Sequence, residues 1–304
     1  MKIYKNPNLD QKHCNGVIAI GNFDGLHLGH QKVISEAKRK AKKNKIPFGA
    51  MTFEPVPVMF FNKKIKNHRI NSLEQKKRQL KKFKLDFLII IKFNKKFSSQ
   101  SAEEFIKKII FKKTKCKFLY VSKNFKFGFR RKGNIKTLKK FEKTYNFKNI
   151  ITRPFKKNNK TISSTFIRKK IRSGKIVEIN RLLNRRWTVV GKVIKGQKRG
   201  RKIGFPTCNL KLNDYVVPKL GVYAVKISSK NFTKNGIANV GYRPTFYGKN
   251  LLLETNIFGI NKNLYNKVIS VHFKKFIRPE KKFRNLIHLK QQSHLQTSRS
   301  LILL

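Results

Sequence analysis

Two histidines lie close together in a glycine-rich loop near the start of the chain. The loop, residues 21–30, reads GNFDGLHLGH and follows the apolar run VIAI. The ring N–H groups of His27 and His30 can donate to a triphosphate and to the charge that develops during group transfer. Gly25 and Gly29 let the backbone approach a ligand, and a helix beginning at Gly29 offers free N–H groups to phosphate. The loop therefore predicts a nucleotide site.

A second polar cluster, TISSTFIR at 161–168, opens a segment with helical periodicity. Its hydroxyl groups can cap the helix that starts there. They can also bind phosphate, with Arg168 neutralising a leaving pyrophosphate. The residues alone leave both interpretations open, and the histidine loop in the same part of the chain favours phosphate binding.

A third constellation lies in residues 191–210, which combine glycines with basic residues and end in GFPTCNL. The Thr207 hydroxyl and the Asn209 carbonyl are two residues apart, so on a strand they project to one face. Oxygen ligands of this kind suit Mg²⁺, which takes its other ligands from ATP and water. The alternative is a turn before a strand. No Walker A pattern occurs in the sequence, which excludes a P-loop kinase.

Carboxylates are scarce, and only Asp214, Glu254 and Glu280 follow residue 183. Glu254 lies in the strand-forming run LLLETNI, where a carboxylate is costly to bury without a role or a partner. A kinase needs a group that orients the attacking hydroxyl and accepts its proton. Glu254 is the best candidate for this base, and a solvated position on an outward strand face is the alternative.

The elements that position the first two clusters alternate along the chain. Ser101 and Glu104 fit a capping box at one helix start. Strands that alternate with helices predict an α/β, doubly wound parallel sheet whose ligands bind at the carboxyl ends of the strands. Apolar runs follow at 48–53, 85–91, 118–122 and 149–152, with helical segments such as 73–83 and 101–113 between them.

The pattern changes after a helical segment at 164–183. From Trp187 onward, runs such as GVYAVKISS and NGIANVGY read as strands bounded by Gly, Asn and Pro, without helices between them. They predict a small all-β barrel, closed by a helix near 281–292. We therefore expect two domains, residues 1–183 and 184–304.

The chain carries 74 Lys and Arg against 13 Asp and Glu, a formal charge of +61. This charge attracts polyanions, but it is spread along the whole chain rather than gathered in one patch. A coding bias toward lysine and a selected polyanion role both remain open, and we expect nucleic acid to bind only non-specifically. Three distant cysteines indicate neither disulfides nor zinc, and the absence of a signal sequence or a long apolar run predicts a cytoplasmic protein without membrane contact.

Together, HxGH after the first strand and ISSTFIR late in the same domain resemble the nucleotidylyltransferase superfamily. The form GNFDGLHLGH is similar to that of prokaryotic bifunctional riboflavin kinase/FAD synthetases, and the likeness extends to Phe53-Glu54-Pro55 and to 124–128, NFKFG. The segment from 188 to about 284 is similar to their riboflavin kinase domain, with GFPTCNL, GVYAV, ANVGYRPTF, LETNI, LYNK and FIRPEKKF in family order.

The resemblance implies an enzyme that phosphorylates riboflavin to FMN and adenylylates FMN to FAD, with ATP and Mg²⁺. It implies Thr207 and Asn209 as Mg-ATP ligands and Glu254 as the base. In the first domain, His27, His30 and Arg168 would act in catalysis. We expect nucleotide and flavin to contact Gly21, Phe23, Asp24, Gly25, Gly29, Asn124, Ser163, Ser164, Thr165, Gly191, Gly196, Gly200, Arg201, Gly204 and Pro206.

The sequence departs from the family at Val56, Ser122 and Lys126, where His, Gly and Arg are usual, and at Asn266, where Gly is usual. The end of the chain, 293–304, also differs, so the kinase is the activity we expect to be weaker. Two rival functions remain. One is an RNA-binding or tRNA-charging HxGH protein, although no KMSKS-like loop is present; the other is a flavin-binding homologue that has lost one activity.

Overall fold

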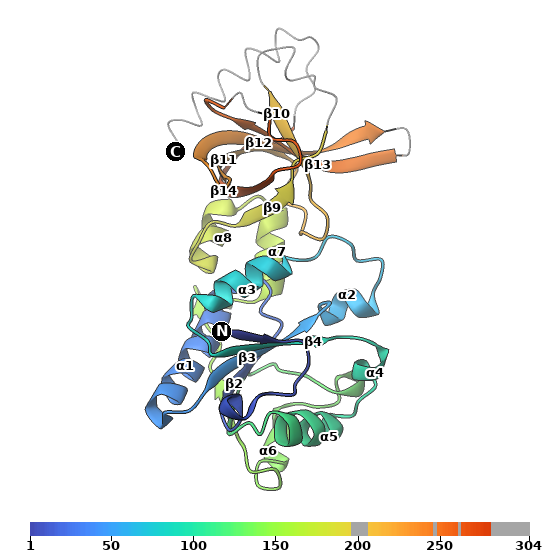
Figure 1. Cartoon of the computed structure of the whole chain (residues 1–304). Coiled ribbons are helices and arrows are strands. Elements are labelled where there is room, and N and C mark those ends of the chain that lie inside the picture. The colour runs from blue at the N-terminus through green and yellow to red at the C-terminus, as the bar shows by residue number, and fades with distance from the viewer. Residues whose placement is uncertain (196–205, 246–247, 261–262, 281–304) are drawn as a thin grey trace. The chain divides into compact units, whose positions relative to one another are not determined.

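The computed structural model describes residues 1–195, 206–245, 248–260 and 263–280 (Figure 1). The chain divides into two compact units. The first consists of Met1–Lys66 and Leu73–Ser163, and the second of Asn67–Ser72 and Ser164–Leu304. The domain boundary expected at 183/184 stays a prediction, as does the cytoplasmic location. No helix within the described ranges has the length and apolar character needed to cross a bilayer.

The first unit, every residue of which is described, contains a six-stranded sheet in which all strands run parallel. The strand order is β1-β4-β3-β2-β5-β6, which confirms the predicted α/β architecture. The chain leaves β2 toward β3 on one side and returns to β5 on the other, so the topological switch point lies at β2 and β5. The strands are β1 (Lys2–Tyr4), β2 (Val17–Ile20), β3 (Phe48–Glu54), β4 (Phe87–Lys92), β5 (Phe118–Ser122) and β6 (Lys148–Thr152).

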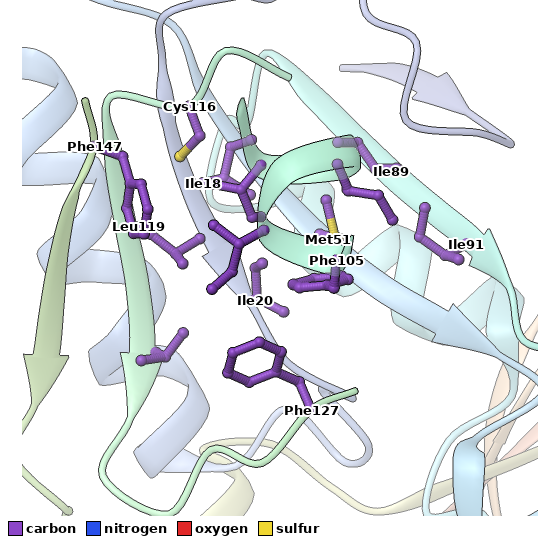
Figure 2. Close-up of a cluster of buried hydrophobic side chains, with 14 of the residues drawn as sticks. Ile18, Ile20, Met51, Ile89, Ile91, Phe105, Cys116, Leu119, Phe127 and Phe147 are labelled. Carbon is purple, nitrogen blue, oxygen red and sulfur yellow. The ribbon is translucent and has the colours of Figure 1, made fainter. Parts of the chain in front are cut away.

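Two hydrophobic clusters cover the two faces of this sheet. Alternate residues of β2 point to opposite faces, so Ile18 and Ile20 enter one cluster while Val17 and Ala19 enter the other. Figure 2 shows the first cluster, where Phe105 packs over the strands. Because both faces are covered, β2 is an uninterrupted apolar run rather than an alternating one.

Helices pack on both sides of the sheet. The predicted capping box is present: Ser101 Oγ accepts from Glu104 N, and a Glu104 carboxylate oxygen accepts from Ser101 N. It opens α5 (Ala102–Glu104), which continues as a π-helix, η2 (Phe105–Lys113). The other helices of this unit are α1 (Leu28–Asn44), α2 (Pro57–Phe61), α3 (Leu73–Lys81), α4 (Lys95–Ser98) and α6 (Ile135–Lys140).

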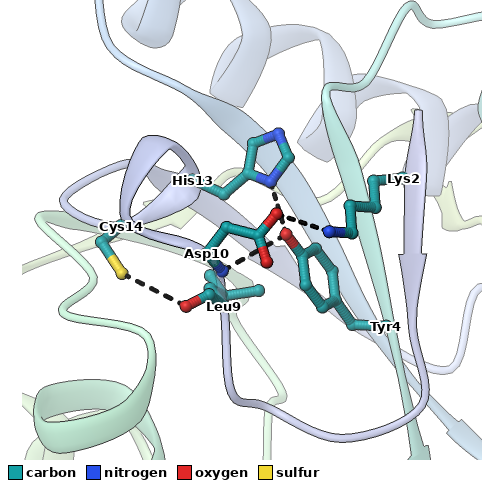
Figure 3. A network of polar contacts seen from close by, with 6 residues as sticks. All are labelled: Lys2, Tyr4, Leu9, Asp10, His13 and Cys14. Carbon is teal, nitrogen blue, oxygen red and sulfur yellow. Dashed lines mark hydrogen bonds and ion pairs between the residues drawn. The ribbon is translucent and has the colours of Figure 1, made fainter.

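The N-terminal strand β1 was not predicted, because its three residues are too few to show a period. A polar network holds it in place (Figure 3). Tyr4 Oη is 2.7 Å from Nδ1 of the buried His13, and it accepts from Asp10 N at 3.3 Å. Lys2 pairs with Asp10 at 2.5 Å. The His13 ring packs on Phe87 with the centroids 5.1 Å apart, so the network joins the core.

In its described part, the second unit has a six-stranded antiparallel sheet of order β10-β13-β12-β11-β14-β9. A bridge between Ile194 and Asn209, with Ile194 N donating to Asn209 O at 2.9 Å, brings the two edges together. The predicted all-β domain is thereby confirmed. Its strands are β9 (Thr188–Lys192), β10 (Thr207–Lys211), β11 (Gly221–Ser228), β12 (Thr233–Thr245), β13 (Gly248–Ile257) and β14 (Val268–Arg278).

Two helices and a distant segment complete this unit. The expected helix at 164–183 is broken at Gly174, whose φ of +71° ends α7 (Ser164–Arg172) before α8 (Ile176–Leu183) begins. The fully buried Trp187 donates its indole N–H to the carbonyl of Ile70 at 3.0 Å. Residues 67–72 therefore belong to the packing of the second unit. The helix expected near 281–292 lies outside the described residues.

Candidate functional site

The loop after β2 is held by its own hydrophobic residues. Phe23, Gly25 and Leu26 have φ angles of +46°, +80° and +40°, and a non-glycine residue keeps such a φ only where the surrounding packing holds it. The side chains of Phe23 and Leu26 are 1% and 2% exposed and enter the core cluster beneath the loop. Burying these two side chains forces the tight turn, so the apolar residues of the motif fix the backbone that presents its polar ones.

The two histidines lie side by side at the start of α1. His27 precedes the helix with an extended backbone, and its ring stacks on that of His30 with the centroids 3.8 Å apart. The edge of Phe23 meets the His30 ring at 5.4 Å. The predicted pair is thus brought together at a helix N-terminus, where N–H donors and a positive dipole end favour phosphate.

Gly29 lies where the beginning of the polar cluster at 161–168 approaches the histidine loop. A Cβ at Gly29 would be 3.2 Å from the Ile162 carbonyl oxygen and 3.2 Å from the His27 ring. Ser163 follows Ile162 directly, so the beginning of the polar cluster lies beside the histidine loop. Ser164, Thr165 and Arg168 belong to the second unit, where Arg168 is 7% exposed and donates from Nε to the His68 carbonyl at 2.8 Å.

Other predicted positions of the first unit surround the same end of the sheet. Asp24 is 1% exposed, and Gly21 donates its N–H to the Met51 carbonyl at 3.1 Å. Asn124 is exposed and follows β5, the strand on the other side of the switch point. This is the edge at which ligands of parallel sheets bind.

Lys76 is a residue of this region that the sequence did not indicate. It belongs to α3, is 1% exposed and donates from Nζ to Thr52 Oγ1 at 3.3 Å. Thr52 in turn donates to the Asn22 carbonyl of the loop at 3.1 Å. In sequence, Lys76 is one of many lysines on a helix, and nothing distinguishes it from its solvated neighbours. Its side chain supports the loop from within the unit.

In the second unit, the strand register places the proposed kinase residues in one row. Asn209 on β10 lies directly opposite Glu254 on β13, and Glu254 lies opposite Asn239 on β12. Directly opposed residues of antiparallel strands share a face. Thr207, two residues before Asn209, shares that face too. The opposite face carries buried core residues such as Leu253, so the row is on the side away from the core.

Asn209 also has a property expected of a cation ligand. Its Oδ1 is buried and has no hydrogen-bond partner among the described residues. A buried polar atom without a partner costs free energy, and a divalent cation supplies the missing contact. The exposed hydroxyl of Thr207 is a second oxygen donor beside it. These residues therefore fit a Mg²⁺ ion of the kind that Mg-ATP carries.

Of the other positions expected to bind phosphate, Gly191 and Pro206 are described. A Cβ at Gly191 would lie 2.9 Å from Leu210 Cδ2, which explains the glycine by close approach of β9 to β10. Gly196, Gly200, Arg201 and Gly204 lie outside the described residues.

Asn266, which replaces a usual glycine, has a φ of +64°. Asparagine tolerates the left-handed region better than other non-glycine residues. Its N–H donates to the Val193 carbonyl at 2.9 Å, so the turn keeps its geometry despite the substitution.

Comparison with known proteins agrees with both halves of this description. A family model described as FAD synthetase matches residues 9–166, and one described as riboflavin kinase matches residues 183–301. A bifunctional riboflavin kinase/FMN adenylyltransferase from Buchnera aphidicola subsp. Schizaphis graminum is 43% identical, over 94% of this chain and 93% of its own. The chain belongs to the bifunctional riboflavin kinase/FMN adenylyltransferase family.

Other members share this full-length similarity. The Escherichia coli K12 bifunctional riboflavin kinase/FMN adenylyltransferase is 34% identical, over 94% of this chain and 92% of its own. Among solved structures, one described as the macrolide-efflux protein from Streptococcus pneumoniae has a TM-score of 0.86 at 29% identity, covering 98% of this chain and 97% of its own. This bifunctional transferase thus uses ATP to phosphorylate riboflavin and to convert FMN to FAD.

Proposed function

We propose that the two reactions use separate sets of residues, the kinase reaction at the row on β10 and β13 and the adenylyl transfer at the histidine loop. The single observation that carries the kinase assignment is the direct pairing of Glu254 with Asn209, whose buried Oδ1 has no partner in the described part of the chain. It supports a cation ligand and a base on adjacent strands of one face. The adenylylation assignment rests on the stacked histidines at a helix start.

In the kinase site, Glu254 accepts the proton of the riboflavin 5′-hydroxyl. The hydroxyl oxygen forms a bond to the γ-phosphorus of ATP while the bond from that phosphorus to the bridging oxygen breaks, giving FMN and ADP. Thr207 and Asn209 would hold Mg²⁺, which offsets the negative charge of the phosphates when bound. Glu254 orients the hydroxyl for this attack, and positioning contributes a large part of the rate in phosphoryl transfer.

In the adenylyltransferase site, an oxygen of the FMN phosphate attacks the α-phosphorus of a second ATP. The bond from the α-phosphorus to the bridging oxygen breaks, and pyrophosphate leaves. No side-chain base is required, because the attacking phosphate is already an anion. His27 and His30 donate to the developing charge. The assignment of Arg168 to the leaving pyrophosphate stays a prediction from the sequence.

The substitution Glu254→Gln tests the kinase assignment. It keeps the size of the side chain and removes the base, so FMN formation from riboflavin should fall by about 10²-fold or more, while FAD formation from added FMN is retained. The matched control is Asp214→Asn, a carboxylate of the same unit that is 62% exposed and pairs with Arg69 at 3.4 Å. Unchanged FMN formation in Glu254→Gln would remove Glu254 from this role.

The charge of +61 supports a second, weaker proposal, that nucleic acid binds the chain without sequence preference. Binding of several unrelated RNA sequences should then be equal and should fall steeply with salt. A tRNA-charging protein would instead form an aminoacyl adenylate. An absence of both FMN and FAD at low and at high salt would favour the flavin-binding homologue without turnover.

A further inference from the structure

Asn239 faces Glu254 from the side opposite Asn209. The register on β12 and β13 pairs the two residues directly, which puts their Cβ atoms roughly 5 Å apart on one face of the sheet. Glu254 is therefore flanked by an asparagine on each neighbouring strand. The proposed roles of Asn209 and Glu254 leave Asn239 without a function.

The orientation of the Asn239 amide is fixed by Glu280. Asn239 Nδ2 donates to Glu280 Oε1 at 3.1 Å. The opposite amide orientation would point Oδ1 at the carboxylate, where two acceptors repel each other. Gly241 leaves room for this contact, because a Cβ there would overlap the Glu280 carboxylate. The oxygen of Asn239 is consequently turned away from Glu280.

That oxygen lacks a donor. Asn239 Oδ1 is shielded from water and has no hydrogen-bond partner among the described residues. A shielded acceptor without a partner destabilises the fold, and such a cost is commonly retained where a ligand supplies the donor.

The substrate carries such a donor next to its reacting hydroxyl. In riboflavin, the 4′-hydroxyl is on the carbon adjacent to the one that bears the 5′-hydroxyl, so the two oxygens are about 3 Å apart, within the reach of one cross-strand pair. Glu254 accepts the proton of the 5′-hydroxyl. The directly opposite Asn239 is placed to accept a hydrogen bond from the 4′-hydroxyl.

We propose that Asn239 is a specificity-determining residue of the kinase site, which selects polyol substrates with a secondary hydroxyl next to the primary hydroxyl that is phosphorylated. The inference rests on the proposed role of Glu254. Glu280 acts through Asn239 by holding its amide, and the glycine at 241 is required by that contact.

A cycle of two enzymes and two substrates tests this role. The full-length protein and Asn239→Leu, which removes the acceptor at similar side-chain volume, are assayed for phosphorylation of riboflavin and of 4′-deoxyriboflavin. The unaltered protein should prefer riboflavin in kcat/KM by roughly 10- to 100-fold, the effect of one unpaired polar group in a binding site. Asn239→Leu should lose activity on riboflavin by the same factor and retain it on the deoxy substrate, so the preference disappears.

The controls separate this role from a structural one. Asn235→Leu, four residues earlier on β12 and on the same face, should leave the preference intact, and FAD formation from FMN reports on folding in each variant. Asn239→Ala removes the same acceptor with a smaller side chain and should also lose the preference if Asn239→Leu fails to fold. Equal losses on both substrates in Asn239→Leu, or an undiminished preference in that variant, would overturn the proposal. Glu254→Gln should lower activity on both substrates alike. If it does not, the base assignment fails, and this result is distinct from a failure of the role of Asn239.

Discussion

A side chain on Gly29 would place its Cβ 3.2 Å from the main-chain oxygen of Ile162. The histidine loop and the segment that leads to Ser163 are 133 residues apart in sequence, and this close approach of two backbones joins them. The same Cβ would lie 3.2 Å from the His27 ring. The space between these two parts of the proposed adenylylation site therefore favours glycine at this position.

The substitution Gly29→Ala should slow FAD formation. The added methyl group has to displace Ile162 or His27 by a few tenths of an ångström, and such overpacking costs about 1–3 kcal/mol, or roughly 10-fold or more if it falls on the reacting geometry. FMN formation from riboflavin by the same preparation is the internal control. If both activities stay unchanged, the spacing around Gly29 has no part in catalysis.

Cys116 should resist thiol reagents until the first unit unfolds. Burial raises the pKa of its thiol to about 12, so almost no thiolate exists at pH 8. Burial also raises the pKa of Cys208, whereas Cys14 is partly exposed and should react first. Labelling with a chromogenic disulfide, followed by mass spectrometry with and without urea, identifies the reacted residue. Rapid modification of Cys116 in the folded protein would contradict this packing.

The first unit should lose stability as the pH falls below 6.5. Burial, and then the charge of Lys12, lower the pKa of His13 beneath its ordinary value of 6.5. The unfolded chain binds this proton more readily, so the contribution of the neutral ring is present above pH 6.5 and is lost as the pH falls through the folded pKa. In urea unfolding at pH 7.5 and 5.5, His13→Gln should reduce the difference in unfolding free energy between the two pH values. If the free energy of unfolding depends on pH identically in both proteins, His13 is not a source of the loss of stability at low pH.

A fragment that starts at residue 184 should be less stable than one that starts at residue 164, and both should be less stable than the second unit in the whole chain. The shorter fragment lacks Asn180, which accepts from Trp187 N at 2.7 Å and donates to the Phe273 carbonyl at 2.9 Å. Both fragments lack Ile70, so the buried indole N–H loses its acceptor at a cost of about 1–3 kcal/mol. Urea unfolding followed by tryptophan fluorescence reports on Trp187, the single tryptophan. Equal midpoints would show that these contacts contribute nothing.

The spacing of apolar residues along the sequence predicted much of the architecture. The alternation of buried strands and helices predicted the parallel sheet, and the capping box at Ser101 was found as expected. The strands of the second unit from β9 onward were also predicted correctly, from runs bounded by Gly and Asn. Local signals of this kind are carried by neighbouring residues, so the sequence shows them directly.

What the sequence could not show depends on contacts between distant residues. Asn239 and Glu280 carry no local signal, and only the strand register sets Asn239 opposite Glu254. The inclusion of residues 67–72 in the second unit was missed for the same reason, since Ile70 is one apolar residue in a polar loop until Trp187 is placed against it. The break at Gly174 divides a segment whose apolar period alone reads as one helix.

The bridge between Ile194 and Asn209 has a consequence for solubility as well as for catalysis. It joins two edge strands, β10 and the extension of β9, and unpaired strand edges are the parts of a sheet that recruit other chains. Asn209 is also a proposed ligand for Mg-ATP, so bound nucleotide would favour the closed edge by mass action. Binding of Mg-ATP would then protect this edge from pairing with other chains, in addition to supplying the phosphate that is transferred.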